Sequence, residues 1–187
     1  IKISSFHGGR IEIVGNSDHP ENVIVQSVLI QNANVNLTGI TVKTDKQYYD
    51  GIKAFNSELV LNKVYVGDSS YDNHYACVQL SSSNMYAIEC IFSYQRYGII
   101  LNDASYAMLT TCSFDHITQS FMSANNSHYN SRGITTTNST PAFFPSRQNQ
   151  NSPITITDTE FDILQQFQFL RSEKLESGGE RMTMMLV

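Results

Sequence analysis

The sequence repeats itself about every two dozen residues, and this period restricts the fold more than any other feature of the chain. Six small or polar residues mark the repeat: Ala33, Ser57, Ser83, Ser105, Ser127 and Asn149, at steps of 24, 26, 22, 22 and 22. Five positions before each marker stands an apolar residue: Val28, Ile52, Val78, Ile100, Met122 and Phe144. Seven positions after each marker stands another: Ile40, Val64, Cys90, Cys112, Ile134 and Ile156. A fixed period in this range is typical of repeat architectures.

The pattern inside each repeat indicates short β-strands. Residues 59–66 and 154–157 are rich in β-branched and aromatic side chains that roughly alternate with polar ones. Asn, Ser, Asp and Gly separate such runs, as turn residues do. No repeat has an apolar face at helical spacing, the leucine-rich signature is absent, and a propeller blade needs about twice this length. The sequence therefore predicts an all-β parallel solenoid of about six to seven coils, with two or three strands per coil.

In a parallel solenoid, equivalent residues of successive coils lie about 4.8 Å apart, so the columns become ladders. We expect the two apolar columns to fill the interior. The Ser column suits a tight bend, where the hydroxyl can bond to the backbone. Tyr49, Tyr75 and Tyr97 form a ring column that can join neighbouring coils. Lys63 and Glu89 are expected to form an exposed cross-strand pair.

Several segments resemble known β-helices. The repeats GIKAFNSELVLNKVYV, ACVQLSSSNMYAIECIF and GIILNDASYAMLTTCSF are similar to coils of right-handed pectin-lyase-like parallel β-helices. The opening FHGGRIEIVG, followed by ENVIVQSVLIQNANVNLTGITV, is similar to the first coils of phage tail fibres and tailspikes. The resemblance covers roughly residues 8–162 and implies a trimeric tail protein of the virion, acting outside the host cell and touching its surface polysaccharide. No catalytic motif of the family carries over.

Composition excludes some classes of function. The 187-residue chain fits one domain, and its net charge is −5 without a basic cluster, which argues against nucleic-acid binding. No apolar run approaches the length of a membrane span. The chain opens within the pattern, so we expect a processed product or a segment of a longer protein. We expect residues 1–162 to form the β-helix and residues 163–187 a terminal cap or subunit contact.

The cysteines indicate packing. Cys90 and Cys112 stand at the same ladder position in adjacent coils, a spacing that a disulfide can span. Parallel side chains on neighbouring rungs usually point in unsuitable directions for a bond, so we expect free buried thiols. No grouping of Cys and His has zinc spacing, and we expect neither a metal nor a cofactor.

The coils differ in length at the turn formed by residues 67–74, which adds four residues relative to the 22-residue coils. Insertions on one face of a repeat protein often mark the binding face. Together with residues 43–46, 93–96 and 115–118, this turn is expected to form a polar, Tyr-bearing wall. The residues we expect to contact a ligand there are Tyr71, His74, Tyr94, Arg96 and His116. Aromatic faces with hydrogen-bonding groups suit a glycan; the alternative is an ordinary solvated turn.

Three carboxylates in the same region, Asp68, Asp72 and Asp115, are the candidates for catalysis. Glycoside hydrolysis needs two carboxyl groups about 5–10 Å apart, and Asp68 and Asp115 are two coils, or about 10 Å, apart. A lyase would instead use a base and a charge neutraliser such as Arg96. The leading hypothesis is a receptor-binding module for host surface polysaccharide, and the alternative is a polysaccharide depolymerase.

Overall fold

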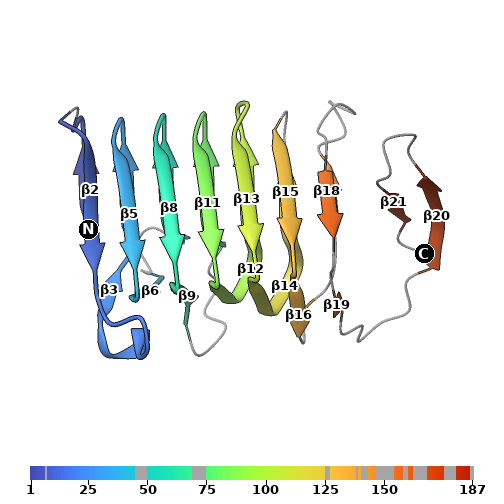
Figure 1. The fold of residues 1–187 in the computed structure, drawn as a ribbon, viewed down its shortest axis with the longest axis horizontal. Helices are drawn as coiled ribbons and strands as arrows, with labels where there is room; N and C mark the ends of the chain where they lie inside the picture. Colours follow the sequence, from blue (N-terminus) through green and yellow to red (C-terminus); the bar gives the residue numbers. More distant parts are fainter. Residues whose placement is uncertain are drawn as a thin grey trace.

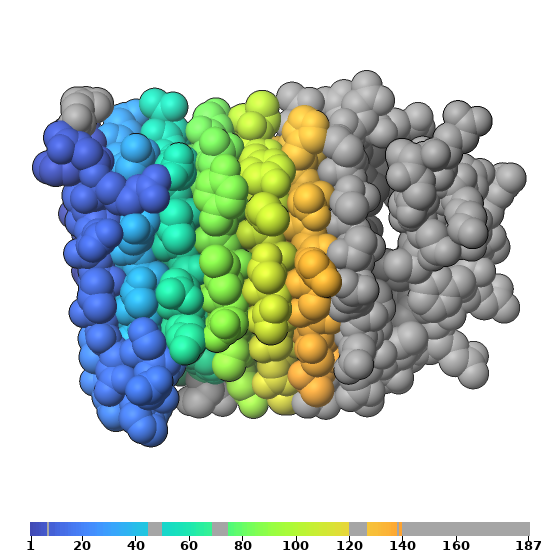
Figure 2. Space-filling model, in the orientation of Figure 1, coloured from blue at the N-terminus to red at the C-terminus, as the bar shows by residue number. Residues whose placement is uncertain are grey.

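The computed structural model is a parallel β-solenoid of about five turns, which confirms the predicted fold class with slightly fewer coils than expected (Figure 1). The structure describes the following residues in full: 1–6, 8–44, 50–68, 75–119, 127–137 and 139. It further describes the strand backbone at residues 120–124, 143–145, 154–157, 160–161, 168–174 and 180–185. Successive coils lie side by side as narrow bands in order of sequence (Figure 2).

Three faces make up each coil. The first face contains β1 (Lys2–Ser4), β4 (Val28–Gln31), β7 (Asp50–Phe55), β10 (Ala76–Ser81), the second halves of β12 (Ile91–Asn102) and β14 (Ser113–Ala124), and β17 (Phe143–Pro145). The second face contains β2 (Arg10–Val14), β5 (Asn34–Thr38), β8 (Glu58–Asn62), β11 (Asn84–Ile88), β13 (Tyr106–Thr110), β15 (His128–Arg132) and β18 (Ile154–Thr157). The third face contains β3 (Ile24–Gln26), β6 (Thr41–Lys43), β9 (Tyr65–Gly67), the first halves of β12 and β14, β16 (Thr135–Thr137) and β19 (Glu160–Phe161).

Alternation of apolar and polar residues explains why these segments are strands with one buried face. In β8, Leu59 and Leu61 are completely buried, whereas the residues that alternate with them, Glu58, Val60 and Asn62, are partly exposed. Each strand pairs in parallel with its equivalents one coil before and one coil after, so the inward side chains stack along the axis. The core is therefore a continuous column of Val, Ile, Leu and Phe that no single coil could bury alone.

The bends between the first and second faces use a serine ladder, as the sequence predicts. The hydroxyls of Ser57, Ser83, Ser105 and Ser127 each accept a hydrogen bond from the backbone N–H of the preceding coil's marker residue, at 3.1–3.2 Å. Ser57 and Ser83 also donate to a carbonyl of their own coil, at 2.7 and 2.8 Å. These buried hydroxyls satisfy backbone donors that the turn would otherwise leave without partners.

The second apolar column is confirmed where its side chains are described. Ile40, Val64, Cys90, Cys112 and Ile134 are all buried. The residue before each of them has a positive φ, which turns the chain from the second face to the third: Gly39, Lys63, Glu89, Thr111 and Gly133. The fold thus places non-glycine residues in a backbone conformation that favours glycine.

The predicted first apolar column is wrong at two residues, Ile100 and Phe144. Val78 pairs with Ile99, and Ile100 pairs instead with Gln79 and lies outside the main core cluster. The bend that follows is one residue longer than its predecessors and accommodates this residue with positive φ angles at both Asp103 and Ala104. Ile99, which the prediction passed over, continues the core.

The register of the last repeat is also wrong. Met122 pairs with Phe143, and Phe144 pairs with Ser123. Ile156 pairs with Ser131 and so does not continue the column of Ile134. The reason is a longer connection: Phe143 and Ile154 are 11 residues apart, against 7 between their partners Met122 and Tyr129. The marker Asn149 lies outside the described residues.

Two predicted contacts between coils are present. The rings of Tyr75 and Tyr97 meet edge to face, with centroids 5.0 Å apart; Tyr49 lies outside the described residues. Lys63 Nζ lies 3.8 Å from Glu89 Oε2, on the exposed surface.

All three cysteines are free and buried, as expected. Burial raises the pKa of the Cys77 and Cys90 thiols, because a thiolate would lose its hydration there.

In the predicted C-terminal segment, β20 (Gln168–Lys174) and β21 (Glu180–Met185) form a two-stranded antiparallel sheet. The cap or subunit contact that we expect for residues 163–187 stays a prediction. A short 3₁₀ helix, η1 (Pro20–Asn22), connects β2 to β3. Within the described residues, the protein has no helix of the length and apolarity that crossing a membrane requires.

Candidate functional site

The predicted wall lies at the corner where the third face meets the first, which we call the third-face corner: Asp68, residues 93–97 and residues 115–119. The sequence predicts turns for residues 93–96 and 115–118, but they run within the continuous strands β12 and β14. Tyr94 and His116 have φ angles of 52° and 53°, and these two residues bend the strands. The corner is therefore built from paired strands instead of open loops.

The positive φ at Tyr94 changes which side chains face outward. Ser93 and Gln95, on either side of it, are both buried at 1% exposure, whereas Tyr94 is half-buried. In the next coil Ile117 is fully buried, in the position equivalent to Gln95. Part of the predicted polar wall therefore points into the solenoid, because a single left-handed residue interrupts the strand alternation.

A stacked pair of rings forms the centre of the outward surface. The rings of Tyr94 and His116 are nearly parallel, with an interplanar angle of 9° and centroids 4.4 Å apart. Their strands pair at Ser93 with Asp115 and at Gln95 with Ile117, which sets the two rings one rung apart. Two predicted ligand-contacting residues therefore form one aromatic stack, in which each ring covers one face of the other.

A carboxylate holds the imidazole of this pair. Nδ1 of His116 lies 2.8 Å from Asp115 Oδ1, and both side chains are about one third exposed. This contact favours the tautomer with its proton on Nδ1, which leaves Nε2 as an acceptor. The corner thus offers the carboxylate of Asp115 and the imidazole of His116, which contact each other beside the ring of Tyr94.

Arg96 lies on the exposed side of the same corner. With its amide oriented to match its neighbours, Gln119 accepts hydrogen bonds from Arg96 Nη2 at 2.7 Å and Nε at 3.3 Å, and it donates to Tyr97 Oη at 2.7 Å. A register shift between Gln95 and Tyr97 inserts one extra residue into β14 here. Such bulges redirect side chains and occur often beside functional sites.

Asp68 belongs to the same column, since it follows Gly67 as Tyr94 follows Ser93, and Gly67 pairs with Ser93. Its backbone carbonyl accepts a hydrogen bond from Tyr65 Oη at 3.3 Å. Tyr65 Oη also contacts Ser93 Oγ. Desolvation raises the pKa of Tyr65, and the hydrogen bond from Ser93 offsets part of that effect. The structure brings Asp68, Tyr94, Arg96, Asp115 and His116 to one corner; Tyr71, Asp72 and His74 lie outside the described residues.

Buried polar groups that the sequence pattern does not indicate lie behind this corner. Asp50 is only 2% exposed; its Oδ2 lies 2.7 Å from Lys53 Nζ, and its Oδ1 accepts a hydrogen bond from the Ala76 backbone N–H at 2.9 Å. Burial raises the pKa of this carboxyl, although Lys53 opposes the effect. Asp50 is the first residue of β7, and its place at the start of that strand was the only signal available.

Gln95 is the other buried polar residue that the sequence analysis overlooked. Its Nε2 donates to Thr44 Oγ1 at 3.4 Å, two coils away, and its Oε1 has no hydrogen-bond partner among the described residues. No sequence pattern predicts this contact, because it depends on the inverted alternation at Tyr94. In the part of the chain that the structure describes, no three His, Cys, Asp or Glu side chains are grouped to hold a metal ion.

Comparisons with known proteins do not identify a relative. No protein-family model, no curated protein and no solved structure matches the chain. The solenoid fold therefore stands on the structure itself, and its resemblance to pectin-lyase-like and tail proteins stays a prediction.

Proposed function

We propose that this protein is a receptor-binding module of the phage tail fibre or tailspike type, which contacts host surface polysaccharide through the third-face corner. The observation that carries the proposal is the Tyr94–His116 ring stack with Asp115 beside it. The exposed parts of an aromatic stack can make apolar contact with a sugar ring, and a neighbouring carboxylate can accept hydrogen bonds from its hydroxyls.

The position of the stack supports this reading. Both rings are attached to strands that are hydrogen-bonded to neighbouring coils, so the surface is preorganised. Both also have a backbone conformation that is uncommon for residues other than glycine, and for Tyr94 this is unfavourable. The same conformation recurs at the bends of the solenoid, and at Tyr94 and His116 it projects the two rings from the corner.

A binding assay with a matched control tests the proposal. The wild type is titrated with purified capsular polysaccharides and lipopolysaccharides, and its affinity is compared with that of Tyr94→Ala and His116→Ala. We expect each substitution to lower the affinity about tenfold, a loss of about 1.4 kcal/mol. Tyr86→Ala removes an exposed aromatic residue from the second face and should bind as the wild type does. Equal affinity of all four proteins, or no binding to any glycan or host cell, rejects the proposal.

The resemblance adds two further parts to this proposal: a trimeric assembly, and a place in the virion tail outside the host cell. Sedimentation of the isolated chain tests the first part, and a clean monomer would count against it.

A polysaccharide depolymerase, a hydrolase or lyase using Asp68, Asp72 and Asp115, is the second candidate. The contact between Asp115 and His116 favours it, because a carboxylate that orients an imidazole is a common arrangement for proton transfer. Incubation with the same glycans should then release new reducing ends or unsaturated products. If product forms and both Asp68→Asn and Asp115→Asn leave its rate unchanged, these residues are not the catalytic groups.

A further inference from the structure

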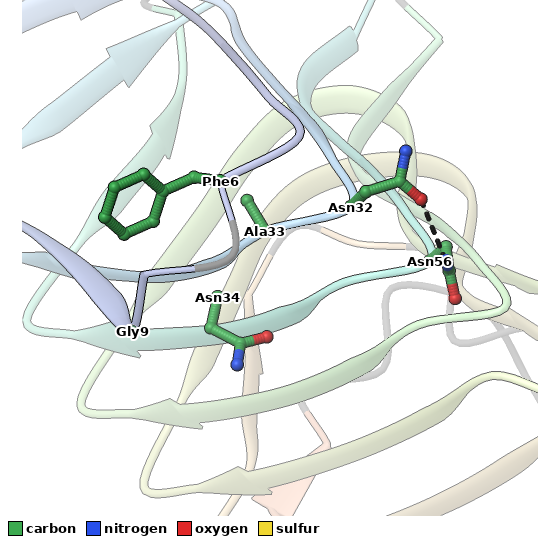
Figure 3. A pocket seen from close by; sticks show the side chains of 6 residues that line it. All are labelled: Phe6, Gly9, Asn32, Ala33, Asn34 and Asn56. Atoms are coloured by element: carbon green, nitrogen blue, oxygen red, sulfur yellow. Dashed lines mark hydrogen bonds between the residues drawn. The ribbon is translucent and has the colours of Figure 1, made fainter.

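A concave site lies in the N-terminal coils, at the bend between the first and second faces. This pocket of about 340 Å³ is lined by Phe6, Gly9, Asn32, Ala33, Asn34 and Asn56 (Figure 3). None of these residues belongs to the third-face corner. Its volume is near the lower end of the range of small-molecule pockets, about 300–1,000 Å³, which suits a ligand of one sugar ring.

Three side-chain amides provide the hydrogen-bonding groups of the pocket. Asn56 Nδ2 donates to Asn32 Oδ1 at 2.8 Å, so the two amides hold each other in place across neighbouring coils. This bond uses one donor and one acceptor and leaves Asn32 Nδ2 and Asn56 Oδ1 to bond elsewhere. The amide of Asn34 makes no hydrogen bond with another described residue. The pocket therefore offers several donors and acceptors to a ligand.

Phe6 provides an apolar surface beside these amides. Phe6 is 42% exposed, so its ring is accessible to a ligand. The ring lies against Gly8, where an added Cβ would come within 3.1 Å of Phe6 Cζ. Figure 3 shows Phe6 and Gly9 on one side of the pocket and the Asn32–Asn56 pair on the other, with Ala33 and Asn34 between.

Charge restricts the class of ligand. None of the lining residues that the structure describes is ionisable. In the column of Asn34, its neighbours on either side are Arg10 and Glu58, and these two form an ion pair with each other. Their charges therefore cancel at the rim of the pocket. An exposed aromatic ring, several amides and no net charge together favour a neutral polyhydroxylated ligand over an anion.

We propose that this pocket binds one neutral sugar unit, with the apolar face of the sugar on Phe6 and its hydroxyls on the amides of Asn32, Asn34 and Asn56. The proposal does not rest on glycan contact at the third-face corner, because the pocket uses different residues. If both sites bind, one polysaccharide chain or two chains are held at two points, which raises the overall affinity.

Nuclear magnetic resonance of the full chain tests the proposal directly. The ¹⁵N-labelled protein is titrated with the methyl glycosides of glucose, galactose, mannose and N-acetylglucosamine, and glucuronic acid serves as the charged comparison. At least one neutral glycoside should shift the side-chain amide signals of Asn32, Asn34 and Asn56. Phe6→Ala and Asn34→Ala should each lower its affinity about tenfold, and Phe6→Tyr, which keeps the ring, should retain binding.

Two controls separate this site from the rest of the surface. Tyr86→Ala and Met108→Ala each remove an exposed apolar side chain elsewhere on the second face. Neither should change the shifts of the Asn32, Asn34 and Asn56 amides. Any of three results overturns the proposal: no shift of the amide signals, unchanged affinity in both Phe6→Ala and Asn34→Ala, or binding of glucuronic acid as tight as that of the neutral glycosides. Because Phe6 and Asn34 are both exposed, these substitutions should leave the folded state intact, which circular dichroism verifies.

Discussion

The hydroxyl of Ser83 accepts a hydrogen bond from the backbone N–H of Ser57, one coil earlier, at 3.1 Å. The same hydroxyl donates to the carbonyl of Ser81 in its own coil, at 2.8 Å. Ser83 is 2% exposed, so water cannot replace it. This contact is one rung of a ladder that joins five coils at the same bend, and it makes the bend sensitive to the loss of a single oxygen atom.

Ser83→Ala should destabilise the protein by about 1–3 kcal/mol, the cost of leaving a buried donor without a partner. The urea midpoint of unfolding measures this loss. Ser82→Ala changes the adjacent, exposed residue of the same bend and should have little effect. If the two variants unfold at the same midpoint, the ladder does not stabilise the fold.

The bend between the second and third faces predicts a stabilising substitution. Thr111 has a φ of 53°, whereas its equivalents Gly39 and Gly133 are glycines. A left-handed conformation costs an L-residue about 1–2 kcal/mol, and glycine loses about 0.5–1 kcal/mol through its greater freedom when unfolded. Thr111→Gly should therefore raise the thermal midpoint, with a gain of up to about 1 kcal/mol.

The reverse substitution provides the comparison. An added Cβ at Gly39 would lie 2.5 Å from backbone atoms of Asn16 and Ser17. Gly39→Ala should therefore lower the thermal midpoint clearly. A loss of stability in Thr111→Gly as large as that in Gly39→Ala would show that the backbone conformation is not the cause.

Asp50 should be structurally important, because it combines an ion pair with a backbone hydrogen bond in a buried place. Asp50→Ala leaves both Lys53 and the Ala76 N–H without their partner, and we expect a loss of about 3 kcal/mol. Asp50→Asn retains an acceptor for the N–H and should cost less. Denaturant unfolding of both variants checks the order.

The pH dependence of these proteins gives a second measurement on Asp50. Because burial raises its pKa, the folded state holds this proton more tightly than the unfolded state does. The contribution of Asp50 is therefore greatest below its unfolded pKa of about 3.9 and declines as the pH rises through the folded value. Relative to Asp50→Asn, the wild type should lose stability as the pH rises above the unfolded pKa of about 3.9; a relative gain would reverse the assignment.

The buried thiols make a prediction for alkaline pH. The pKa values of Cys77 and Cys90 are raised by burial, so the unfolded chain releases these protons first, near pH 8.5. The contribution of Cys77 to stability should fall as the pH rises above that value, so Cys77→Ala should lose less stability there than the wild type does. In the native protein a thiol reagent should react slowly, and in denaturant it should modify all three cysteines. Fast modification of the native protein would contradict the burial.

Tyr94→Gly should separate stability from binding. Glycine adopts the positive φ of this position without strain, so the substitution should keep or raise the thermal midpoint. It removes the ring that stacks on His116, so polysaccharide affinity should fall about tenfold, whereas Tyr94→Phe should retain it. Loss of folding in Tyr94→Gly would show that the ring is needed mainly for packing.

The fold could be predicted because the apolar columns depend on local spacing. Ile40, Val64 and Cys90 recur at positions that only a solenoid buries together. The register failed where a connection changed its length, at Asp103–Ala104 and between Phe143 and Ile154. Bend length is not visible in the spacing of apolar residues alone, since both Ile99 and Ile100 fit the column.

The candidate site could be predicted only in part. The sequence placed Tyr94, Arg96, Asp115 and His116 on one wall, and the structure brings them to one corner. The sequence did not indicate that Gln95 points inward or that Gln119 forms hydrogen bonds with Arg96. Nor did it indicate the pocket at Phe6, because its lining residues come from three coils and have no common motif.

Periodicity was sufficient to establish a parallel β-solenoid, because each coil can bury its apolar residues only against the equivalent residues of the coils before and after it. The direction of the polar side chains at the corner required the folded chain, since a left-handed residue at Tyr94 or His116 inverts the alternation of a strand. That conformation is held by pairing with coils more than 20 residues away, and no local pattern of residues specifies it.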